Sequence, residues 1–368
     1  MKILYLTDQV YLHGGIEKVL SQKANHLAEV LGDEVTIITY NQQNKKPSYS
    51  FSSKITFLDL GVNYEIAQSY FHLKNIKKVP HHISGLKKVI QHLKPDVIVS
   101  SSFGPDFYFL PYVEKCIPII KEFHSSRYFY KKTGVNLKGK ILNYLNRFTE
   151  KRYSQLVVLN EAERGFYDSD KITVIPNPAQ ISGEKATLQS KKILAAGRIS
   201  PVKDFASLIT IFFHLKDEFP EWELHFFGEN YGGTQEKLEA QIKEYGLEKS
   251  ILFKGVCNDL KSEMVNYSIY AMTSETECFP MVLLEALSVG VPVITYDCPT
   301  GPQYIVQNAE DSFLIPHKNL DIFTEKLKHL MRNEDLRKEM GDKAIVNVQR
   351  FGIDQVMQQW KDLFRSLY

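Results

Sequence analysis

Residues 192–204 read Lys-Ile-Leu-Ala-Ala-Gly-Arg-Ile-Ser-Pro-Val-Lys-Asp, a strand-length apolar run that passes through a glycine into a loop with two cations. The run restarts, past the middle of the chain, an alternation of short β-rich segments and longer helical patterns that begins at residue 2. Such alternation is typical of βαβ units, in which helices cover a parallel sheet. We therefore predict an α/β fold of two tandem, doubly wound, Rossmann-like domains.

The expected elements follow the hydrophobic pattern. Strands are predicted at residues 2–6, 34–39, 55–59, 96–100, 117–121, 155–159 and 172–175, and again at 192–196, 223–227, 250–254, 269–273, 292–296 and 312–315. Helices in the first half are predicted at 16–30, 73–93, 138–150 and 161–167. Two such domains in tandem would hold a ligand in a cleft between the carboxyl edges of their sheets.

The 368-residue length exceeds what one hydrophobic core usually sustains, so two domains are expected. The polar stretch 180–191 lacks an apolar period and predicts a linker. We expect a first domain over residues 1–178 and a second over 190–350. The last helical pattern, at about 353–368, is expected to cross back and pack on the first domain. Its apolar residues at helical spacing are Val356, Trp360, Leu363 and Phe364.

The composition, 43% hydrophobic and 24% charged, is that of a soluble globular protein. The longest apolar runs are strand-length and fall far short of the roughly 20 residues that span a membrane. The first residues form an expected strand and lack the long apolar region of a secretory signal. The four cysteines show no paired close spacing, so neither a zinc site nor a disulfide framework is indicated. We expect a cytoplasmic protein.

Charge is distributed unevenly along the chain. Residues 1–190 carry 25 Lys and Arg against 17 Asp and Glu, whereas the remainder carries 20 against 26. Much of the basic excess lies in residues 74–94 and 127–152, where lysines alternate with Tyr128, Phe129, Tyr130 and Tyr144. This composition suits the anionic inner face of a plasma membrane, and a solvated basic face is the alternative. Nucleic acid is disfavoured because no recognised binding motif is present.

Two glutamates, Glu277 and Glu285, bracket an apolar run that contains Pro280. Proline suits the first turn of a helix, so Glu277 should precede a helix and Glu285 should lie about one turn inside it. The amides of that first turn suit a negatively charged or hydroxyl-rich ligand. The helix is apolar nearly all round and should be buried, where a carboxylate needs a partner. The alternative is that both acids are solvated.

The loop after residues 193–196 carries Gly197, Arg198 and Lys203. Glycine lets the backbone turn closely, arginine supplies a bidentate fork and lysine a point charge, and together they can grip a diphosphate. Near the N-terminus, Gly14 and Gly15 open a helix and would permit close approach of a ligand, although a simple tight turn explains them equally well. No Gly-x-Gly-x-x-Gly follows the first strand, which disfavours a nicotinamide or flavin enzyme.

His124 follows an expected strand, and a histidine at a strand end in a doubly wound domain faces the ligand site more often than one elsewhere. The run Asp168-Ser169-Asp170 has the Asp-x-Asp form of metal-dependent sugar transferases. It precedes a strand instead of following one, so we interpret it as a turn. No other cluster offers ligands for a metal, and none is expected.

Taken together, these motifs resemble glycosyltransferase family four, the retaining, nucleotide-sugar-dependent enzymes of the two-Rossmann-domain, or GT-B, type. The likeness runs over nearly the whole chain, and residues 290–294 and 298–302 are similar to bacterial polysaccharide members. The motifs are Gly14-Gly15-Ile16-Glu17, Glu122-Phe123-His124, Val174-Ile175-Pro176-Asn177-Pro178, Gly197-Arg198 with Lys203, and Glu277-Cys278-Phe279-Pro280-Met281-Val282-Leu283-Leu284-Glu285-Ala286.

The resemblance implies a role for each matching residue. Arg198 and Lys203 would bind the donor diphosphate, with Gly15 nearby. Glu285 would bind the ribose hydroxyls. Glu277 would bind the transferred sugar together with the segment Phe279, Pro280 and Met281, and His124 would lie close to that sugar. Where many members have glycine after the first glutamate this chain has Cys278, which puts the choice of sugar in doubt.

The resemblance also implies an activity. We expect a metal- and cofactor-independent hexosyltransferase that moves a hexose or N-acetylhexosamine from a UDP-sugar to a polyprenyl- or lipid-linked saccharide. The alternatives are a nucleotide-sugar epimerase or hydrolase on the same scaffold, and a non-catalytic partner that binds sugar or nucleotide for another transferase. The sequence does not specify the donor sugar, the acceptor, the linkage or the oligomeric state.

Overall fold

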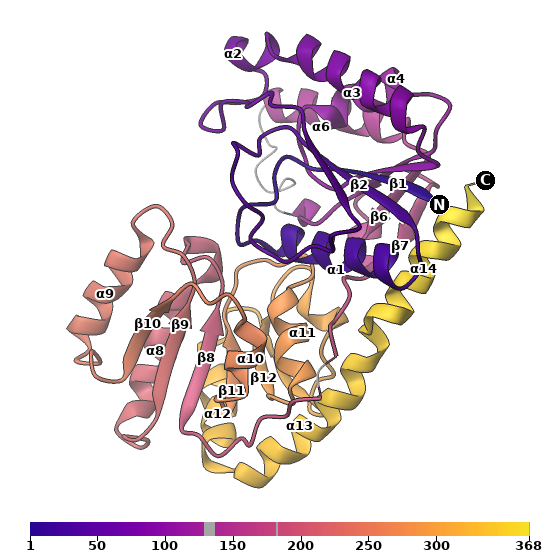
Figure 1. Ribbon diagram of the computed structural model, residues 1–368. Helices are drawn as coiled ribbons and strands as arrows, with labels where there is room; N and C mark the ends of the chain where they lie inside the picture. Colours follow the sequence, from indigo (N-terminus) through magenta and orange to yellow (C-terminus); the bar gives the residue numbers. More distant parts are fainter. Residues whose placement is uncertain (129–136, 182, 368) are drawn as a thin grey trace. The chain divides into compact units, whose positions relative to one another are not determined.

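The computed structural model describes residues 1–128, 137–181 and 183–367 (Figure 1). The chain divides into two compact units. Unit 1 comprises Met1–Pro178 and Ile353–Tyr368, and unit 2 comprises Ala179–Gly352. Within the described residues, no helix is long and apolar enough to cross a membrane.

Unit 1 contains a parallel sheet with the strand order β3-β2-β1-β4-β5-β6-β7. Its central strands are buried on both faces, as expected when helices cover a parallel sheet. In β1, Leu6 pairs with Ile38 on one side and Ser100 on the other, which fixes the register of three strands. The strands are β1 Lys2–Leu6, β2 Glu34–Thr39, β3 Thr56–Asp59, β4 Val97–Ser100, β5 Ile119–Glu122, β6 Gln155–Val158 and β7 Ile172–Val174.

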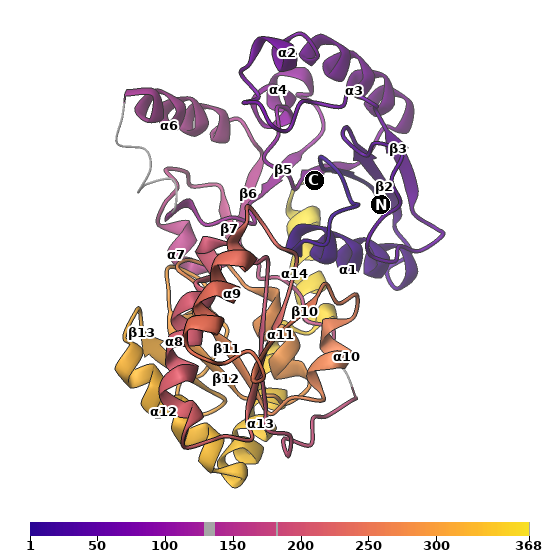
Figure 2. The same ribbon diagram turned by 90° about the vertical axis from the view of Figure 1, so that its left-hand side faces the viewer.

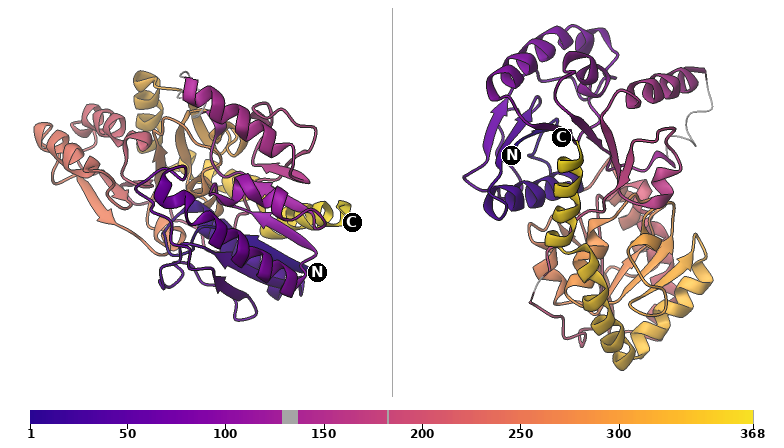
Figure 3. Two further views of the ribbon diagram at one scale, coloured as in Figure 1. Left: turned by 90° about the horizontal axis from the view of Figure 1, so that it is seen from above. Right: turned by 90° about the vertical axis from the view of Figure 1, so that its right-hand side faces the viewer.

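Helices α1 and α14 cover one face of this sheet, and α3 and α4 cover the other. Figures 1 and 3 show α14 running beside α1. The predicted return of the C-terminal helix is confirmed, since Trp360 shares a core with Ile3 and Tyr5. The helices are α1 Gly15–Glu29, α2 Leu73–Ile76, α3 Val79–Leu93, α4 Asp106–Val113, α6 Leu137–Glu150, α7 Glu161–Arg164 and α14 Ile353–Ser366.

Unit 2 contains a second parallel sheet with the order β10-β9-β8-β11-β12-β13. Helices α8, α9 and α12 share one core with the sheet, and α10 and α13 pack with α11. The strands are β8 Lys192–Ala196, β9 Glu223–Phe227, β10 Ile251–Gly255, β11 Ile269–Met272, β12 Val293–Asp297 and β13 Ser312–Pro316. The helices are α8 Phe205–Lys216, α9 Thr234–Glu244, α10 Leu260–Met264, α11 Met281–Ser288, α12 Leu320–Arg332 and α13 Glu334–Val348, with short 3₁₀ turns η1 Pro201–Lys203, η2 Pro302–Tyr304 and η3 Gln349–Phe351.

The predicted strands all occur within about two residues of their expected positions, but the helix predictions were less complete. The helix expected over 73–93 is interrupted between α2 and α3, because Pro80 suits only the first turn of a new helix. Helix α4 was missed, since its run of aromatic residues has no helical period and Pro111 lies inside it.

The stretch 180–191 is not a free linker. Ala186 and Leu188 are buried in unit 2, and the guanidinium of Arg337 donates to the Leu188 carbonyl at 2.9 and 3.2 Å. The amide of Ala186 donates to the Val289 carbonyl at 2.9 Å. Two apolar anchors within a polar stretch are too few to produce a period, which is why the pattern was misread.

Candidate active site

Two glycines let strands β8 and β9 end in close contact. Gly197 follows β8 with φ +147°, and Gly228 follows β9 with φ +150°. A Cβ at position 228 would lie 1.9 Å from the Gly197 carbonyl oxygen, and one at 197 would lie 2.7 Å from Cε of Lys203. Only glycine fits either position. Gly197 therefore leaves space for the Lys203 stem over the end of the strand.

Lys203 forms an ion pair with Glu277. Its Nζ lies 2.5 Å from Oε1 of Glu277, and the two side chains are 19% and 13% exposed. The turn that carries Lys203 is fixed by Asp204, which caps α8 by accepting a hydrogen bond from the Ser207 amide at 3.4 Å and also accepts one from Ser207 Oγ at 2.6 Å. Thr273, just beyond β11, donates to the Asp204 carbonyl at 2.8 Å. The structure thus brings together two residues that lie 74 positions apart in the sequence.

The backbone around Glu277 is held by a neighbouring loop. The Glu277 amide donates to the Pro299 carbonyl at 2.8 Å, and the Thr300 amide donates to the Glu277 carbonyl at 2.6 Å. Gly301 packs so closely that a Cβ there would lie 2.7 Å from the Cys278 carbonyl oxygen. Cys278 is buried and is not among the residues with positive φ, as expected for a residue that carries a side chain.

Helix α11 begins at Met281. Pro280 is extended, with φ −68° and ψ 114°, and is the N-cap residue instead of lying in the first turn. Since the residue before a helix has non-helical dihedrals, proline there still ends the loop cleanly. Glu285 lies in the second turn and is buried, so the solvated alternative for this acid is wrong. Phe279 is buried with its ring edge-on to Phe351.

Tyr270 of β11 lies within electrostatic reach of both glutamates. Its hydroxyl donates to the Ala196 carbonyl at the end of β8 at 3.3 Å. Burial, together with the negative charges of Glu277 and Glu285, raises the pKa of Tyr270 well above its usual value, so it stays a neutral donor. Sequence reasoning missed this residue, because a tyrosine in an apolar strand resembles ordinary core.

Arg198 lies in different surroundings from Lys203. It is exposed, and its guanidinium lies 5.3 Å from the ring centroid of Tyr231. The Tyr231 amide donates to the Ile199 carbonyl at 3.0 Å, which holds this aromatic residue beside the β8 loop. Tyr231 was not predicted, since nothing in its local sequence distinguishes it from any loop tyrosine.

In unit 1, His124 follows β5 and is joined to a buried chain of charges. Its Nε2 lies 3.4 Å from Oε1 of Glu122, and the same oxygen lies 2.6 Å from Nζ of Lys23 on α1. Nζ of Lys23 lies 3.6 Å from the ring centroid of Trp360 on α14. Sequence reasoning missed Lys23 and the pairing role of Glu122, although charged residues within an apolar helix face and an apolar strand signal such a need for partners.

The pKa values of Lys23 and Glu122 are set by burial and by the charge of each residue's partner. Burial lowers the pKa of Lys23 despite the attraction of Glu122. Burial alone would raise the pKa of Glu122, but the combined attraction of Lys23 and His124 holds it well below its usual value. We conclude that Glu122 is ionised and that it orients both Lys23 and His124.

Gly15 begins α1, as predicted, and Gly14 is the N-cap residue. A Cβ at Gly14 would lie 2.2 Å from Oε2 of Glu17, so the carboxylate of Glu17 occupies the space that this glycine leaves. Gln9 donates to the other oxygen of the same carboxylate. Position 14 therefore needs glycine because the Glu17 carboxylate packs against it.

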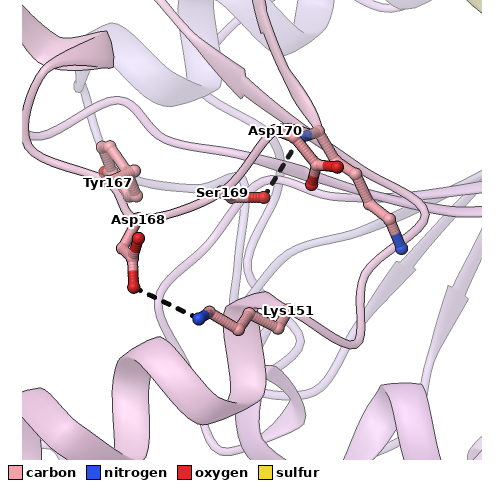
Figure 4. Close-up of a pocket in the computed structure, with 6 residues that line it drawn as sticks. Lys151, Tyr167, Asp168, Ser169 and Asp170 are labelled. Atoms are coloured by element: carbon pink, nitrogen blue, oxygen red, sulfur yellow. Dashed lines mark hydrogen bonds and ion pairs between the residues drawn. The ribbon is translucent and has the colours of Figure 1, made fainter.

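The Asp-x-Asp run lies in the loop between α7 and β7, which confirms its interpretation as a turn. Figure 4 shows this loop lining a shallow pocket, in which Lys151 Nζ lies 3.2 Å from Oδ2 of Asp168. The loop precedes β7, whereas His124 follows β5, so the pocket and His124 lie at opposite edges of the parallel sheet. Among the described residues, no group of three or more His, Cys, Asp or Glu side chains could hold a metal ion.

Two family models match the chain. Glycosyltransferase Family 4 matches residues 13–182, and Glycosyl transferases group 1 matches residues 178–346. The chain belongs to glycosyltransferase family four.

Several relatives of this glycosyltransferase are bacterial. An uncharacterized glycosyltransferase of Haemophilus influenzae is 28% identical over 98% of this chain and 99% of its own length. A Campylobacter jejuni GalNAc-alpha-(1->4)-GalNAc-alpha-(1->3)-diNAcBac-PP-undecaprenol alpha-1,4-N-acetyl-D-galactosaminyltransferase is 23% identical over 96% of each chain. The chain spans 23% to 48% of the length of three further relatives. The solved structure of a mutant of S. aureus TarM in complex with fondaparinux, alpha-GlcNAc-glycerol and UDP shares the fold, with a TM-score of 0.81 and 14% identity over 99% of this chain and 100% of that one.

Within this glycosyltransferase, the predicted residues therefore fall into separate local arrangements. One arrangement lies in unit 2 and consists of Lys203, Glu277 and the start of α11. Tyr270 lies within electrostatic reach of both Glu277 and Glu285 there. Arg198 lies beside Tyr231. His124 and Gly15 lie in unit 1.

Proposed function

We propose that the chain is a retaining, metal-independent glycosyltransferase that moves a hexose or N-acetylhexosamine from a UDP-sugar to a lipid-linked saccharide in bacterial polysaccharide synthesis. The observation that carries the proposal is the Lys203–Glu277 ion pair beside the start of the buried helix α11. The TarM complex, which contains UDP and alpha-GlcNAc-glycerol, and the undecaprenol-linked acceptor in the name of the C. jejuni relative support the choice of donor and acceptor.

In the proposed reaction, the bond between the sugar and the diphosphate breaks, and negative charge develops on the diphosphate. Arg198 and Lys203 stabilise this charge, and Glu285 holds the ribose hydroxyls. Preorganised cations are effective here because their orientation costs little at the moment of reaction. The acceptor hydroxyl attacks from the face that the diphosphate leaves and gives its proton to the departing diphosphate, so no covalent nucleophile is assigned.

The ion pair gives Lys203 and Glu277 a linked role in this scheme. Because both side chains are largely buried, a diphosphate that takes Lys203 would leave the Glu277 carboxylate in need of new donors. The hydroxyls of the transferred sugar supply them, and the segment from Phe279 through Pro280 to Met281 binds the same sugar. Binding of the donor thus replaces the Lys203–Glu277 ion pair with two contacts, one between Lys203 and the diphosphate and one between Glu277 and the sugar hydroxyls.

The proposal extends to a cytoplasmic location at the inner face of the plasma membrane, where a polyprenyl-linked acceptor is found. The support is the basic excess of the first half of the chain, above all in residues 74–94 and 127–152. Of the aromatic and basic residues predicted for this surface, Phe129, Tyr130, Lys131 and Lys132 lie outside the described residues.

The test is release of UDP from a panel of UDP-sugars, with and without a membrane extract that supplies acceptors. Turnover that requires the extract supports transfer, and UDP release or epimerisation without any acceptor supports the hydrolase or epimerase alternative. Lys203→Ala should lower kcat/KM by about 10²-fold or more. Lys343→Ala, in an exposed pair with Glu339 on α13, is the control. Absence of turnover with every donor would contradict the proposal.

A further inference from the structure

Helix α6 carries a stripe of large apolar side chains that face solvent. All five are between 41% and 74% exposed. Their spacing of four, three, one and three residues places them on one face of the helix, within about 100° of arc. The stripe consists of Leu137, Ile141, Tyr144, Leu145 and Phe148.

The opposite face of α6 is attached to unit 1, so the stripe is not a packing surface of its own domain. Asn146 is buried and accepts a 2.9 Å hydrogen bond from the Tyr108 hydroxyl on α4. Glu150 is buried, and its carboxylate accepts hydrogen bonds from both terminal nitrogens of Arg127, one of them at 2.9 Å. Figures 2 and 3 show α6 at the periphery of unit 1, extending beyond strands β5 and β6.

The charges on and beside the stripe are cationic. Among the described side chains of α6, Lys140 and Arg147 are exposed, and the acid Glu150 is buried in its pair with Arg127. Arg152, just past the helix, is also exposed, and its guanidinium lies 5.2 Å from the ring centroid of Phe148. The stripe is therefore bordered by exposed cations without an exposed acid among those side chains.

This combination selects the occupant. Acyl chains accept an apolar stripe, and phosphate headgroups accept the cations beside it. A second copy of the chain would cover the apolar residues but would bring its own cations against Lys140 and Arg147, where like charges repel. We propose that α6 lies in the surface of a bilayer that contains anionic phospholipid, with the stripe in the acyl region and the cations at the phosphates.

The inference deepens the proposed function, whose lipid-linked acceptor lies in the same membrane. Its test, however, uses neither donor nor acceptor. Purified protein is mixed with vesicles of phosphatidylcholine alone or of phosphatidylcholine with the anionic lipid phosphatidylglycerol, and bound protein is measured by flotation. Binding is expected on the anionic vesicles and is expected to weaken in high salt.

Ile141→Ser/Phe148→Ser is the decisive variant, because both side chains are exposed and folding should be unaffected. It should bind anionic vesicles at least about 100-fold more weakly, since each apolar side chain contributes about tenfold or more. Lys140→Gln/Arg147→Gln should lose about 20-fold or more. The matched control is Val346→Ser, which removes a side chain that is 73% exposed from α13 of unit 2; its binding should not change.

A spectroscopic variant tests the depth of the stripe. Tyr144→Trp places an indole at an exposed position, while Trp222 and Trp360 are buried and should not respond to lipid. Its emission should shift to the blue on anionic vesicles and be quenched by brominated acyl chains. Three results would overturn the inference: no vesicle binding by the wild type, equal binding by the Ile141→Ser/Phe148→Ser variant, or a dimer without lipid that this variant converts to monomer, which would assign the stripe to a second copy. Loss of transferase activity with intact vesicle binding would instead count against the proposed reaction.

Discussion

Replacing Lys23 by methionine should destabilise unit 1 strongly, because it removes one partner of a buried ion pair. The Lys23 and Glu122 side chains are 1% and 3% exposed, with Nζ and Oε1 2.6 Å apart. Methionine keeps an unbranched stem against Trp360 but leaves the Glu122 carboxylate without its lysine. Breaking a buried pair in this way costs about 3–5 kcal/mol, or about 10²- to 10⁴-fold in the folding equilibrium.

Urea unfolding followed by tryptophan fluorescence measures this cost. In a Trp222→Phe background, Trp360 is the remaining tryptophan and reports on unit 1. With an m-value of about 2–3 kcal/mol/M, the midpoint should fall by about 1–2 M. The control is Lys2→Met, which breaks an exposed pair with Glu34 in the same unit and should leave the midpoint nearly unchanged.

A double variant decides whether the cost arises from the Glu122 carboxylate that has lost its lysine and keeps His124 and Ser101 beside it. Lys23→Met/Glu122→Gln removes both charges and should be more stable than Lys23→Met alone, since a neutral pair carries no buried charge. If the double variant were as unstable as the sum of the two single variants, the pair would not be coupled and the reasoning would be refuted. A Lys23→Met protein as stable as the Lys2→Met control would refute it equally.

Four further predictions concern acid, the site glycine and the thiols. The pKa of Glu122 is held below its unfolded value of about 4.3, so the ion pair of Glu122 with Lys23 stabilises the protein above that pH. This stabilisation is lost as the pH falls toward the folded pKa. The free energy of unfolding of Glu122→Gln should therefore depend less steeply on pH in this range. Burial lowers the pKa of His82 to about 4, so its neutral form stabilises the fold above pH 6.5. As the pH falls from 6.5 toward 4, the free energy of unfolding should decrease by about 3 kcal/mol. His82→Phe, which places a ring among the neighbouring aromatic rings, should abolish this decrease in urea titrations across the same pH range. Gly197→Ala should lower kcat/KM about as much as Lys203→Ala because the new Cβ meets the lysine stem, whereas Gly246→Ala, also at positive φ but with nothing within 4 Å, should keep its activity in the same assay. A thiol reagent should modify exposed Cys116 first in the native protein, while Cys278 and Cys298, which are buried, should react only after denaturation; rapid modification of Cys298 would contradict the structure.

The sequence was most informative where one physical signal dominates. Buried parallel strands are continuous apolar runs, so β1 and β8 could be located to the residue. The two glutamates around Pro280 were recognisable because a carboxylate in an apolar helix is costly unless it has a purpose. Helix α4 shows the opposite case, since Phe107 and Leu110 are buried while Tyr112 on the same helix is exposed, and no period separates them.

Contacts between residues far apart in the chain were beyond the sequence. Nothing local indicates that Lys203 meets Glu277, because the meeting depends on the parallel order of β8 and β11. The same holds for Lys23, whose partners come from β5 and from the C-terminal helix. The pattern of the chain predicts which side chains need partners, and the sheet topology decides which partners they find.

The return of α14 has a consequence for how the protein is made. Trp360 and Phe364 complete the core of unit 1, yet they are synthesised after every residue of unit 2. A ribosome therefore delivers unit 2 as one uninterrupted stretch, while the strands made first must wait for the last turns of the chain to cover them. We expect newly made unit 1 to be the part that chaperones protect during synthesis, and a prematurely terminated chain to expose the apolar surface that α14 normally seals.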